Sequence, residues 1–268
     1  MHTFRILMLA AAVASTAFAV DAPKNATQYV SLDPGQVSLA GEIGRRIDLT
    51  IQKNLLAINV DNDFLKPFHE KQTQLFGYIG LGKLLDAAVN FAYYSRDPKV
   101  VELKNHLLSD LLGTQLEDGY IGSFPAGARL RDIFDEHEIA YVIHALIDDY
   151  RRFHDAPSLQ AAQRLADYFV TNYKTAVASR DPKLVCTVDV ERAFILLSAA
   201  TGDANYRVYI LERGGLRGWN SPIDLVNDGQ YSGGDGHAYT FMNRCLAQFD
   251  LYREEPDPKL LGQSHRIM

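Results

Sequence analysis

Hydrophobic residues recur at three- and four-residue steps along most of the chain, which is the spacing of one face of an α-helix. Between positions 41 and 58 the residues at these steps are Ile43, Ile47, Ile51, Leu55 and Ile58. The same spacing predicts further helices over 78–94, 98–111, 139–153, 157–169, 188–200, 205–211 and 239–252. No segment shows the sustained alternation that indicates a β-strand. The pattern therefore predicts an all-α protein.

A short polar motif recurs between successive predicted helices. It reads SRDP at 95–98, HDAP at 154–157, TGDA at 201–204 and EPDP at 255–258. An aspartate directly before a helix is a favourable N-cap, so the motif predicts an array of αα-hairpins of roughly 50 residues each. An open α-solenoid and a closed α/α toroid both fit this array. The long loops after Gln115 and Leu211 favour the toroid, since such loops gather at one end of a helical ring.

The expected fold is thus an (α/α)6-toroid-like barrel of αα-hairpin repeats. The chain supplies roughly four hairpins where such a ring needs six, so we expect the barrel to be incomplete and truncated at its C-terminus. An open ring would expose an apolar flank of its last hairpin, which could associate with another surface. The flank residues are Phe241, Leu246, Phe249 and Leu251.

The first nineteen residues have the pattern of a secretory signal peptide. A polar start precedes an apolar run from Ile6 to Val13, and Ala17-Phe18-Ala19 closes it. The run is shorter than the roughly 20 residues of a membrane span. We therefore predict a signal peptide over 1–19, a linker over 20–36, a helical barrel domain over 37–268, and a secreted or periplasmic protein. A disordered tail on a cytosolic protein is the alternative.

Composition and charge narrow the choice of partners. The 268 residues are 47% hydrophobic and 22% charged, which is typical of a folded globular protein. The net charge of −6 offers no basic patch for nucleic acid or for an anionic membrane surface. The two cysteines, Cys186 and Cys245, cannot by themselves supply a zinc site with three or four thiolates. They either form one disulfide or are small buried apolar residues.

Three loops carry residues that could bind a ligand. The first, over 115–124, combines Glu117 and Asp118 with Tyr120 and Phe124. Carboxylates bind sugar hydroxyls and aromatic rings pack on the apolar face of a sugar, so this loop could form part of a carbohydrate site. A plain helix end, with a turn at Asp118-Gly119, is the alternative.

The second segment crowds Asp135, Glu136 and Glu138 around His137 at the start of a helix. His137 also lies at helical spacings from Tyr141 and His144, as the ligands of a metal would. The residue four positions after His137 is Tyr141 instead of histidine, so the zinc motif HExxH is absent and no metal site is predicted. A polar helix cap and a residue lining a pocket both remain open for His137.

The third loop, over 228–239, has four glycines before His237 and the start of a helix. The glycines allow close approach of the backbone to a ligand, or they form a flexible linker. The loop lacks the GKS or GKT of a phosphate-binding P-loop and the GxGxxG of a dinucleotide site.

Taken in order, these motifs resemble the β-L-arabinofuranosidases of glycoside hydrolase family 127. The resemblance extends over roughly 37–261. It rests on the helix over 41–64, the SRDP motif at 95–98, QLEDGYIGSF at 115–124, HEIAY at 137–141, TGD at 201–203 and GHA at 236–238.

The resemblance implies an (α/α)6 barrel followed by β-sandwich domains, and the removal of arabinofuranose or related sugars from glycans. It places His137 and His237 in the sugar pocket. In the characterised branch a zinc-bound cysteine is the nucleophile, a glutamate is the acid/base, and a glutamate and three cysteines hold the zinc. These residues follow the GHA helix and have no counterpart before Met268. We therefore expect no cofactor in this chain and no activity from the chain alone.

Three hypotheses follow for function. The chain is the N-terminal part of a glycoside hydrolase acting on arabinofuranose-containing plant glycans, or a non-catalytic carbohydrate-binding toroid. The third is another toroid hydrolase, with Glu117, Asp118, Asp135 or Glu136 forming a general acid/base pair. In each case the partner is a carbohydrate. The residues expected to face one concave surface are His137, His237, Asp118, Tyr120 and Phe124.

Overall fold

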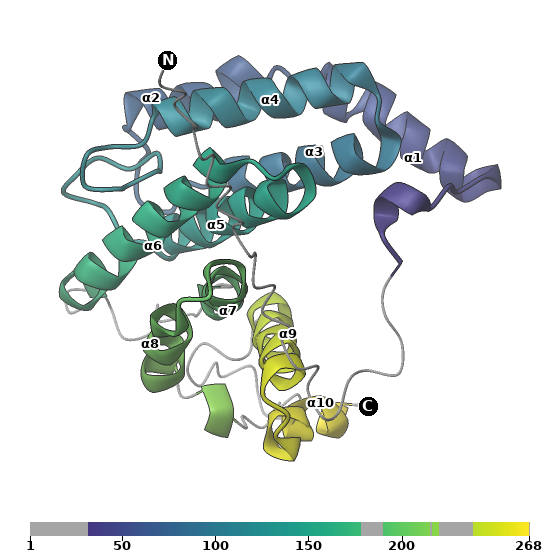
Figure 1. Cartoon of the computed structure of the whole chain (residues 1–268). Helices are drawn as coiled ribbons and strands as arrows, with labels where there is room; N and C mark the ends of the chain where they lie inside the picture. Colours follow the sequence, from purple (N-terminus) through teal and green to yellow (C-terminus); the bar gives the residue numbers. More distant parts are fainter. Residues whose placement is uncertain (1–31, 178–189, 215, 220–237, 268) are drawn as a thin grey trace, which may run out of the picture.

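The computed structural model describes residues 32–177, 190–214, 216–219 and 238–267. Within these ranges the chain forms helices and no strand (Figure 1). The helices are α1 (Gly41–Lys53), α2 (Lys66–Glu70), α3 (Leu81–Ser95), α4 (Pro98–Gly113), α5 (Ile133–Phe153), α6 (Ala156–Val177), α7 (Val190–Thr201), α8 (Ala204–Gly214), α9 (Ala238–Glu254) and α10 (Gly262–Ile267). Single helical turns lie at Pro34–Gln36 (η1), Leu55–Ala57 (η2), Asp61–Leu65 (η3), Leu216–Gly218 (η5) and Pro258–Leu261 (η6). The predicted all-α class is confirmed.

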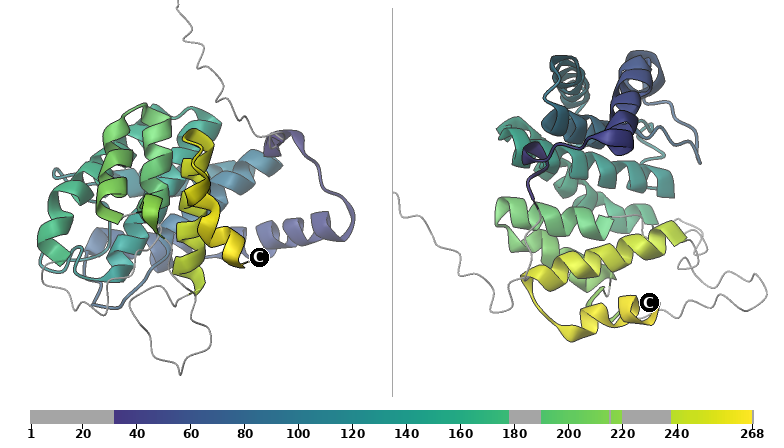
Figure 2. Two further views of the ribbon diagram at one scale, coloured as in Figure 1. Left: turned by 90° about the horizontal axis from the view of Figure 1, so that it is seen from below. Right: turned by 90° about the vertical axis from the view of Figure 1, so that its right-hand side faces the viewer.

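The helices pair into hairpins that are stacked in chain order. Helices α3 and α4, α5 and α6, and α7 and α8 each pack on one another, and α3 also packs on α5, α5 on α7, and α7 on α9. Figure 2 shows this stack from α1–α4 at one end to α9 and α10 at the other. In the part of the chain that the structure describes, no helix is long and apolar enough to cross a membrane.

The recurring aspartates start helices as predicted. The side chains of Asp97, Asp203 and Asp257 each accept a hydrogen bond from the backbone N–H two positions on, at 2.9, 2.9 and 3.0 Å. Asp155 accepts a bond from the Ser158 hydroxyl at 3.3 Å instead. The contacts of Asp97, Asp203 and Asp257 satisfy N–H groups that a helix leaves unpaired in its first turn. At these three positions the helix start is therefore fixed by local chemistry.

Two helix boundaries differ from the prediction. The first helix ends at Lys53, because the backbone leaves the helical region at Asn54 and continues as the 3₁₀ turn η2. Helix α5 begins at Ile133, before the predicted start at 139, since the side chain of Asp132 caps it by accepting the N–H of Phe134 at 2.8 Å. The first turns of α5 are rich in acids, and a search for apolar periodicity therefore overlooks them.

The predicted apolar flank of the last hairpin is only half exposed. Leu246 and Phe249 are 43% and 36% exposed on α9, and Met242 on the same face is 53% exposed. The prediction was wrong for Phe241 and Leu251, which are buried. Phe241 packs on the ring of Trp219, and Leu251 joins a small apolar cluster that includes residues of η5 and η6. These single turns cover a side of α9 that an isolated helix would expose.

Four predicted features lie outside the described residues. They are the signal peptide over 1–19, the start of the linker up to residue 31, Cys186, and the glycine-rich loop with His237. Cys245 is described and is buried in α9.

A glycine allows α3 and α5 to pack closely in the core. Gly82, in the first turn of α3, lies against the α5 backbone. A Cβ atom at this position would lie 2.6 Å from the nitrogen of Val142 and 2.7 Å from the carbonyl carbon of Tyr141. These are backbone atoms that cannot move aside alone. The separation of the two helices is therefore set by the absence of a side chain at position 82.

Replacing Gly82 by alanine should push α3 away from α5. We expect Gly82→Ala to lower the free energy of unfolding by about 1–3 kcal/mol, the usual effect of overpacking a core. Gly113→Ala, at the end of α4, is the matched control because its Cβ would meet nothing within 4 Å. Urea unfolding of both variants measures the difference. Equal stability of the two variants would contradict the proposed close contact.

Candidate functional site

The first two turns of α5 carry four polar side chains that are buried. Asp135 and Glu136 are 0% exposed, Glu138 is 2% exposed and His137 is 6% exposed. Ionisable groups are seldom buried to this degree unless partners compensate the loss of water. The partners of these side chains therefore define what this end of α5 does.

Asp135 holds the loop over 115–131 against α5. Its carboxylate accepts the Tyr120 hydroxyl at 2.8 Å and the N–H of Leu130 at 2.7 Å. Burial raises the pKa of Asp135 to about 6, although both hydrogen bonds favour the charged form. Tyr120 is itself fully buried, and its hydroxyl also accepts the N–H of Phe124 at 3.2 Å. Tyr120 and Phe124 thus form the inner support of the loop.

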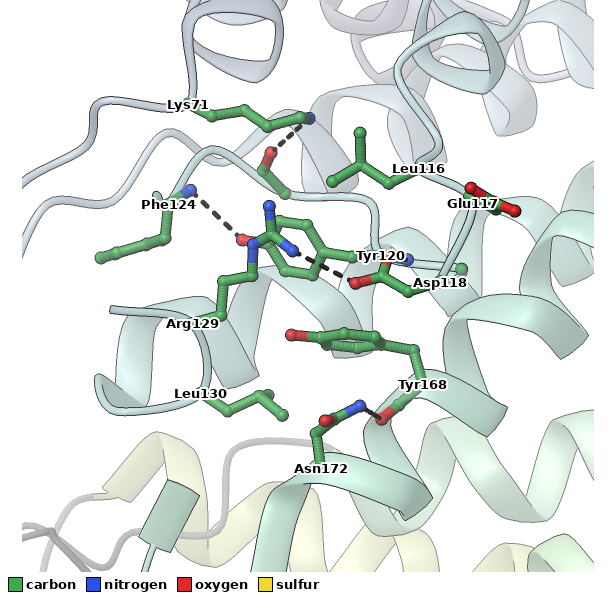
Figure 3. Close-up of polar contacts among 12 residues, drawn as sticks. Lys71, Leu116, Glu117, Asp118, Tyr120, Phe124, Arg129, Leu130, Tyr168 and Asn172 are labelled. Carbon is green, nitrogen blue, oxygen red and sulfur yellow. Dashed lines mark hydrogen bonds and ion pairs between the residues drawn. The ribbon is translucent and has the colours of Figure 1, made fainter. Parts of the chain in front are cut away.

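Two cations, Lys71 and Arg129, make further contacts with the same loop (Figure 3). The Arg129 guanidinium lies 4.3 Å from the centre of the Tyr120 ring and forms an ion pair with Asp118 at 3.3 Å. The Lys71 ammonium donates to the carbonyl of Gly122 at 3.2 Å. Asp118 is exposed, unlike Tyr120, and its carboxylate is engaged by Arg129. These contacts indicate that the loop supports the start of α5.

The four carboxylates considered as an acid/base pair fall into two different environments. Asp135 and Glu136 are fully buried, whereas Glu117 and Asp118 are exposed. A hydrolytic pair must reach the same glycosidic bond from two sides. The burial of Asp135 and its bonds to the loop favour a structural role over that chemistry.

Glu138 joins α5 to the beginning of α3. Its two carboxylate oxygens accept the N–H groups of Gly80 and Gly82, each at 2.7 Å. Gly80 is the residue directly before α3 and Gly82 lies in its first turn, where N–H groups have no partner within the helix. Burial raises the pKa of Glu138 to about 7, against the effect of these two bonds and of Lys83. One side chain of α5 thereby caps α3.

Around His137 the structure brings together residues from three helices. The His137 ring centre lies 5.0 Å from those of Tyr78 and Tyr141 and 5.4 Å from that of Tyr239. The Lys83 ammonium lies 4.7 Å from the ring centres of Tyr141 and Tyr239, and 5.4 Å from that of Tyr78. The hydroxyls of Tyr141 and Tyr239 are hydrogen-bonded to each other. We call these five residues the His137 cluster.

The His137 cluster has the chemistry to hold a small polar ligand. Its rings offer apolar faces, and its imidazole, phenols and ammonium can form hydrogen bonds with hydroxyl groups. The Tyr78 hydroxyl is buried, and among the described residues it has no hydrogen-bond partner. Burial, together with the charge of Glu138, raises the pKa of Tyr78, so its hydroxyl remains a proton donor. A buried donor of this kind is normally satisfied by water or a ligand.

The described residues do not fit the zinc site of the characterised branch. They contain no group of three or more His, Cys, Asp or Glu side chains placed to hold a metal ion. Cys245, the one cysteine described, is buried in α9, and burial raises the pKa of its thiol. The spacing of His137, Tyr141 and His144 is also that of metal ligands, but in the structure their rings pack on one another. The ring centres of His137 and Tyr141 are 5.0 Å apart, and those of Tyr141 and His144 are 5.9 Å apart.

Sequence reasoning found His137 but missed three members of its cluster. Tyr78 and Tyr239 were assigned only to the ends of apolar helix stripes, and Lys83 was not singled out. Their position in the sequence could have indicated them, because each lies within a few residues of a helix start that follows a loop. His237, expected to share a pocket with His137, lies outside the described residues.

Comparisons with known proteins agree with the observed fold. The family model for the β-L-arabinofuranosidase GH127 catalytic domain matches residues 43–268. A solved GH127 β-arabinofuranosidase is similar with a TM-score of 0.63 and 16% identity, over 87% of this chain and 42% of that chain. A GH127 β-L-arabinofuranosidase from Geobacillus stearothermophilus T6 is similar with a TM-score of 0.61 and 18% identity, over 85% and 44%.

The chain thus spans less than half the length of these solved structures. At such identities the likeness concerns the fold, which is consistent with the predicted α/α toroid. No curated protein sequence matches the chain.

The contact between Glu138 and α3 leads to a prediction about pH. Because burial raises its pKa from 4.5 to about 7, Glu138 holds a proton in the folded state that the unfolded state has released. The free energy of unfolding should therefore fall as the pH rises from about 4.5 to 7. Glu138→Gln should remove this component of the pH dependence. The same variant should also lower the free energy of unfolding by about 1–3 kcal/mol, because the NH₂ group of glutamine cannot accept a hydrogen bond from a backbone N–H.

Urea unfolding between pH 5 and 8 measures both effects. Glu102→Gln, on the exposed face of α4, is the control and should follow the wild type. Parallel pH profiles for the wild type and Glu138→Gln would contradict the assignment.

Proposed function

Because the chain belongs to the GH127 β-L-arabinofuranosidase family, we propose that its His137 cluster binds an arabinofuranose unit of a plant glycan. The domain is a β-arabinofuranosidase-like glycoside hydrolase domain, for which a carbohydrate is the fitting partner. The choice of arabinofuranose and of plant glycans follows from the family resemblance. The placement of the sugar at His137 also starts from that resemblance, and the contacts of the described residues support it.

The observation that supports this placement is the enclosure of His137 by three tyrosine rings and one ammonium group. A furanose ring presents C–H groups and several hydroxyls, and it carries no charge. Tyr78, Tyr141 and Tyr239 are half-buried and offer both ring faces and hydroxyls. Sites for such ligands combine apolar surface with a few convergent polar groups. The cluster meets this description with residues of α5, α9 and the start of α3.

Three polar groups of the cluster have a defined part in this proposal. The Tyr78 hydroxyl donates to a sugar oxygen and gains the partner that it lacks among the described residues. The Lys83 ammonium, held among the tyrosine rings, donates to a second oxygen. The His137 imidazole can donate or accept, depending on its tautomer. Tyr120 and Phe124 contribute indirectly, because with Asp135 they support the turns of α5 that carry His137.

We further propose that this chain binds the sugar without hydrolysing it. Hydrolysis needs a nucleophile and an acid, which in the characterised branch are a zinc-bound cysteine and a glutamate. The two cysteines of the sequence are too few for the three thiolates that this zinc site requires. The described carboxylates nearest to His137 in sequence, Asp135, Glu136 and Glu138, are buried, and Asp135 and Glu138 bind the protein backbone.

Export is part of the same proposal, since plant glycans lie outside the cell. The polar start, the apolar run from Ile6 to Val13 and the small residues Ala17-Phe18-Ala19 support a cleaved signal peptide. We expect cleavage after Ala19 or Ala22. N-terminal sequencing of the protein from its native host measures this, and an intact Met1 would contradict it.

Removing the His137 ring should strongly weaken sugar binding. We expect titration calorimetry with arabinose-containing oligosaccharides to show binding to the wild type and at least about a 10-fold loss for His137→Ala, a typical effect of losing a buried contact. His69→Ala is the matched control. His69 is exposed on α2 and pairs with Asp110 of α4 at 2.6 Å, so its loss should leave binding unchanged.

Two results would contradict the proposal. The first is unchanged oligosaccharide binding by a folded His137→Ala variant. The second is turnover of the oligosaccharides by the wild-type chain at ordinary enzymatic rates, which would show that the chain carries its own catalytic groups.

A further inference from the structure

A strained turn lies directly before Tyr78. The N–H of Gly77 donates to the carbonyl of Gln74 at 2.9 Å, which closes a turn with Leu75 and Phe76 at its centre. Phe76 has a φ angle of +67°. A positive φ at the third residue of a turn favours glycine or asparagine, and a bulky side chain there is unusual. The phenylalanine is therefore in an unfavourable backbone conformation.

The side chain of Phe76 is also in an unfavourable environment. It is 63% exposed, and its neighbour Leu75 is 55% exposed. An exposed aromatic ring gains little from the hydrophobic effect. Neither core packing nor backbone preference explains why phenylalanine occupies this position. Strained residues that bring no folding advantage are typical of ligand-binding sites.

The turn is held in place by the residue that starts α5. The N–H of Phe76 donates to the carboxylate of Asp132, whose other oxygen accepts the N–H of Phe134 at 2.8 Å. The Phe134 ring lies 5.8 Å from that of Tyr78, a member of the His137 cluster. Asp132 is 4% exposed, so this anchor is shielded from water. The backbone of Phe76, two residues before Tyr78 of the His137 cluster, is thus tied to the start of α5, while its ring is exposed.

We propose that Phe76 is a platform for the sugar unit that follows the one bound in the His137 cluster. A sugar ring can pack its C–H face on an exposed aromatic ring while its hydroxyls remain in water. The platform would make the site select an oligosaccharide over a free monosaccharide. This inference rests on the proposed function, because it requires the first sugar to be bound at His137.

The test compares a monosaccharide with a longer ligand. The probes are methyl L-arabinofuranoside and an arabinofuranosyl disaccharide, titrated calorimetrically into the wild type, Phe76→Gly, Phe76→Asn and Phe76→Trp. Glycine and asparagine both tolerate a positive φ, so these two variants should fold with an unchanged or higher melting temperature. Phe249→Ala, which removes an exposed ring from α9, is the control.

We expect Phe76→Gly and Phe76→Asn to bind the disaccharide about 3- to 10-fold more weakly, the range of an aromatic contact. Their affinity for the monosaccharide should not change. Phe76→Trp and Phe249→Ala should bind both probes as the wild type does.

Other outcomes separate this inference from the proposed function. If the wild type binds both probes equally, or if the Phe76 variants weaken both equally, the platform is refuted while sugar binding at His137 stands. A marked loss of thermal stability in both Phe76→Gly and Phe76→Asn would show a structural role and refute the platform. If neither probe binds the wild type, both proposals fail.

Discussion

The capping of α3 by Glu138 is the contact on which the rest of the candidate site depends. Its carboxylate joins two N–H groups of the α3 start to the second turn of α5, and Gly82 lets the two backbones meet. Lys83 is the next residue after Gly82 in α3, and Tyr78 lies shortly before the start of α3. Their distances from His137 and Tyr141 are therefore consequences of this one junction. Without it, the side chains of the His137 cluster would belong to two separate surfaces.

Two features beside the start of α5 lower stability. The Tyr78 hydroxyl has no hydrogen-bond partner among the described residues, and the Phe76 backbone has a positive φ angle. Natural proteins tend to depart from optimal packing where they bind ligands. These two features support the location of the site beside the start of α5.

The sequence was sufficient for the hairpin array and insufficient for most of the site. Helix periodicity and aspartate caps act over a few residues, so Asp97 and Asp203 could mark helix starts without knowledge of the fold. The acidic neighbours of His137 and the family motif HEIAY indicate it as a candidate site residue. Its contacts with Tyr78 and Tyr239 arise only when α3, α5 and α9 pack together. The burial of the Tyr120 side chain likewise depends on its hydrogen bond to Asp135, fifteen positions further along the chain. No local sequence pattern indicates this burial.

The central claim is that this domain holds an arabinofuranose unit within the His137 cluster. A crystal structure of the chain with an arabinofuranosyl oligosaccharide tests it most directly. The account predicts a sugar ring in contact with His137 and Tyr141, with a ring oxygen or hydroxyl at hydrogen-bond distance from the Tyr78 hydroxyl. A sugar bound instead beside Asp118 and Arg129, with the His137 cluster empty, would contradict it.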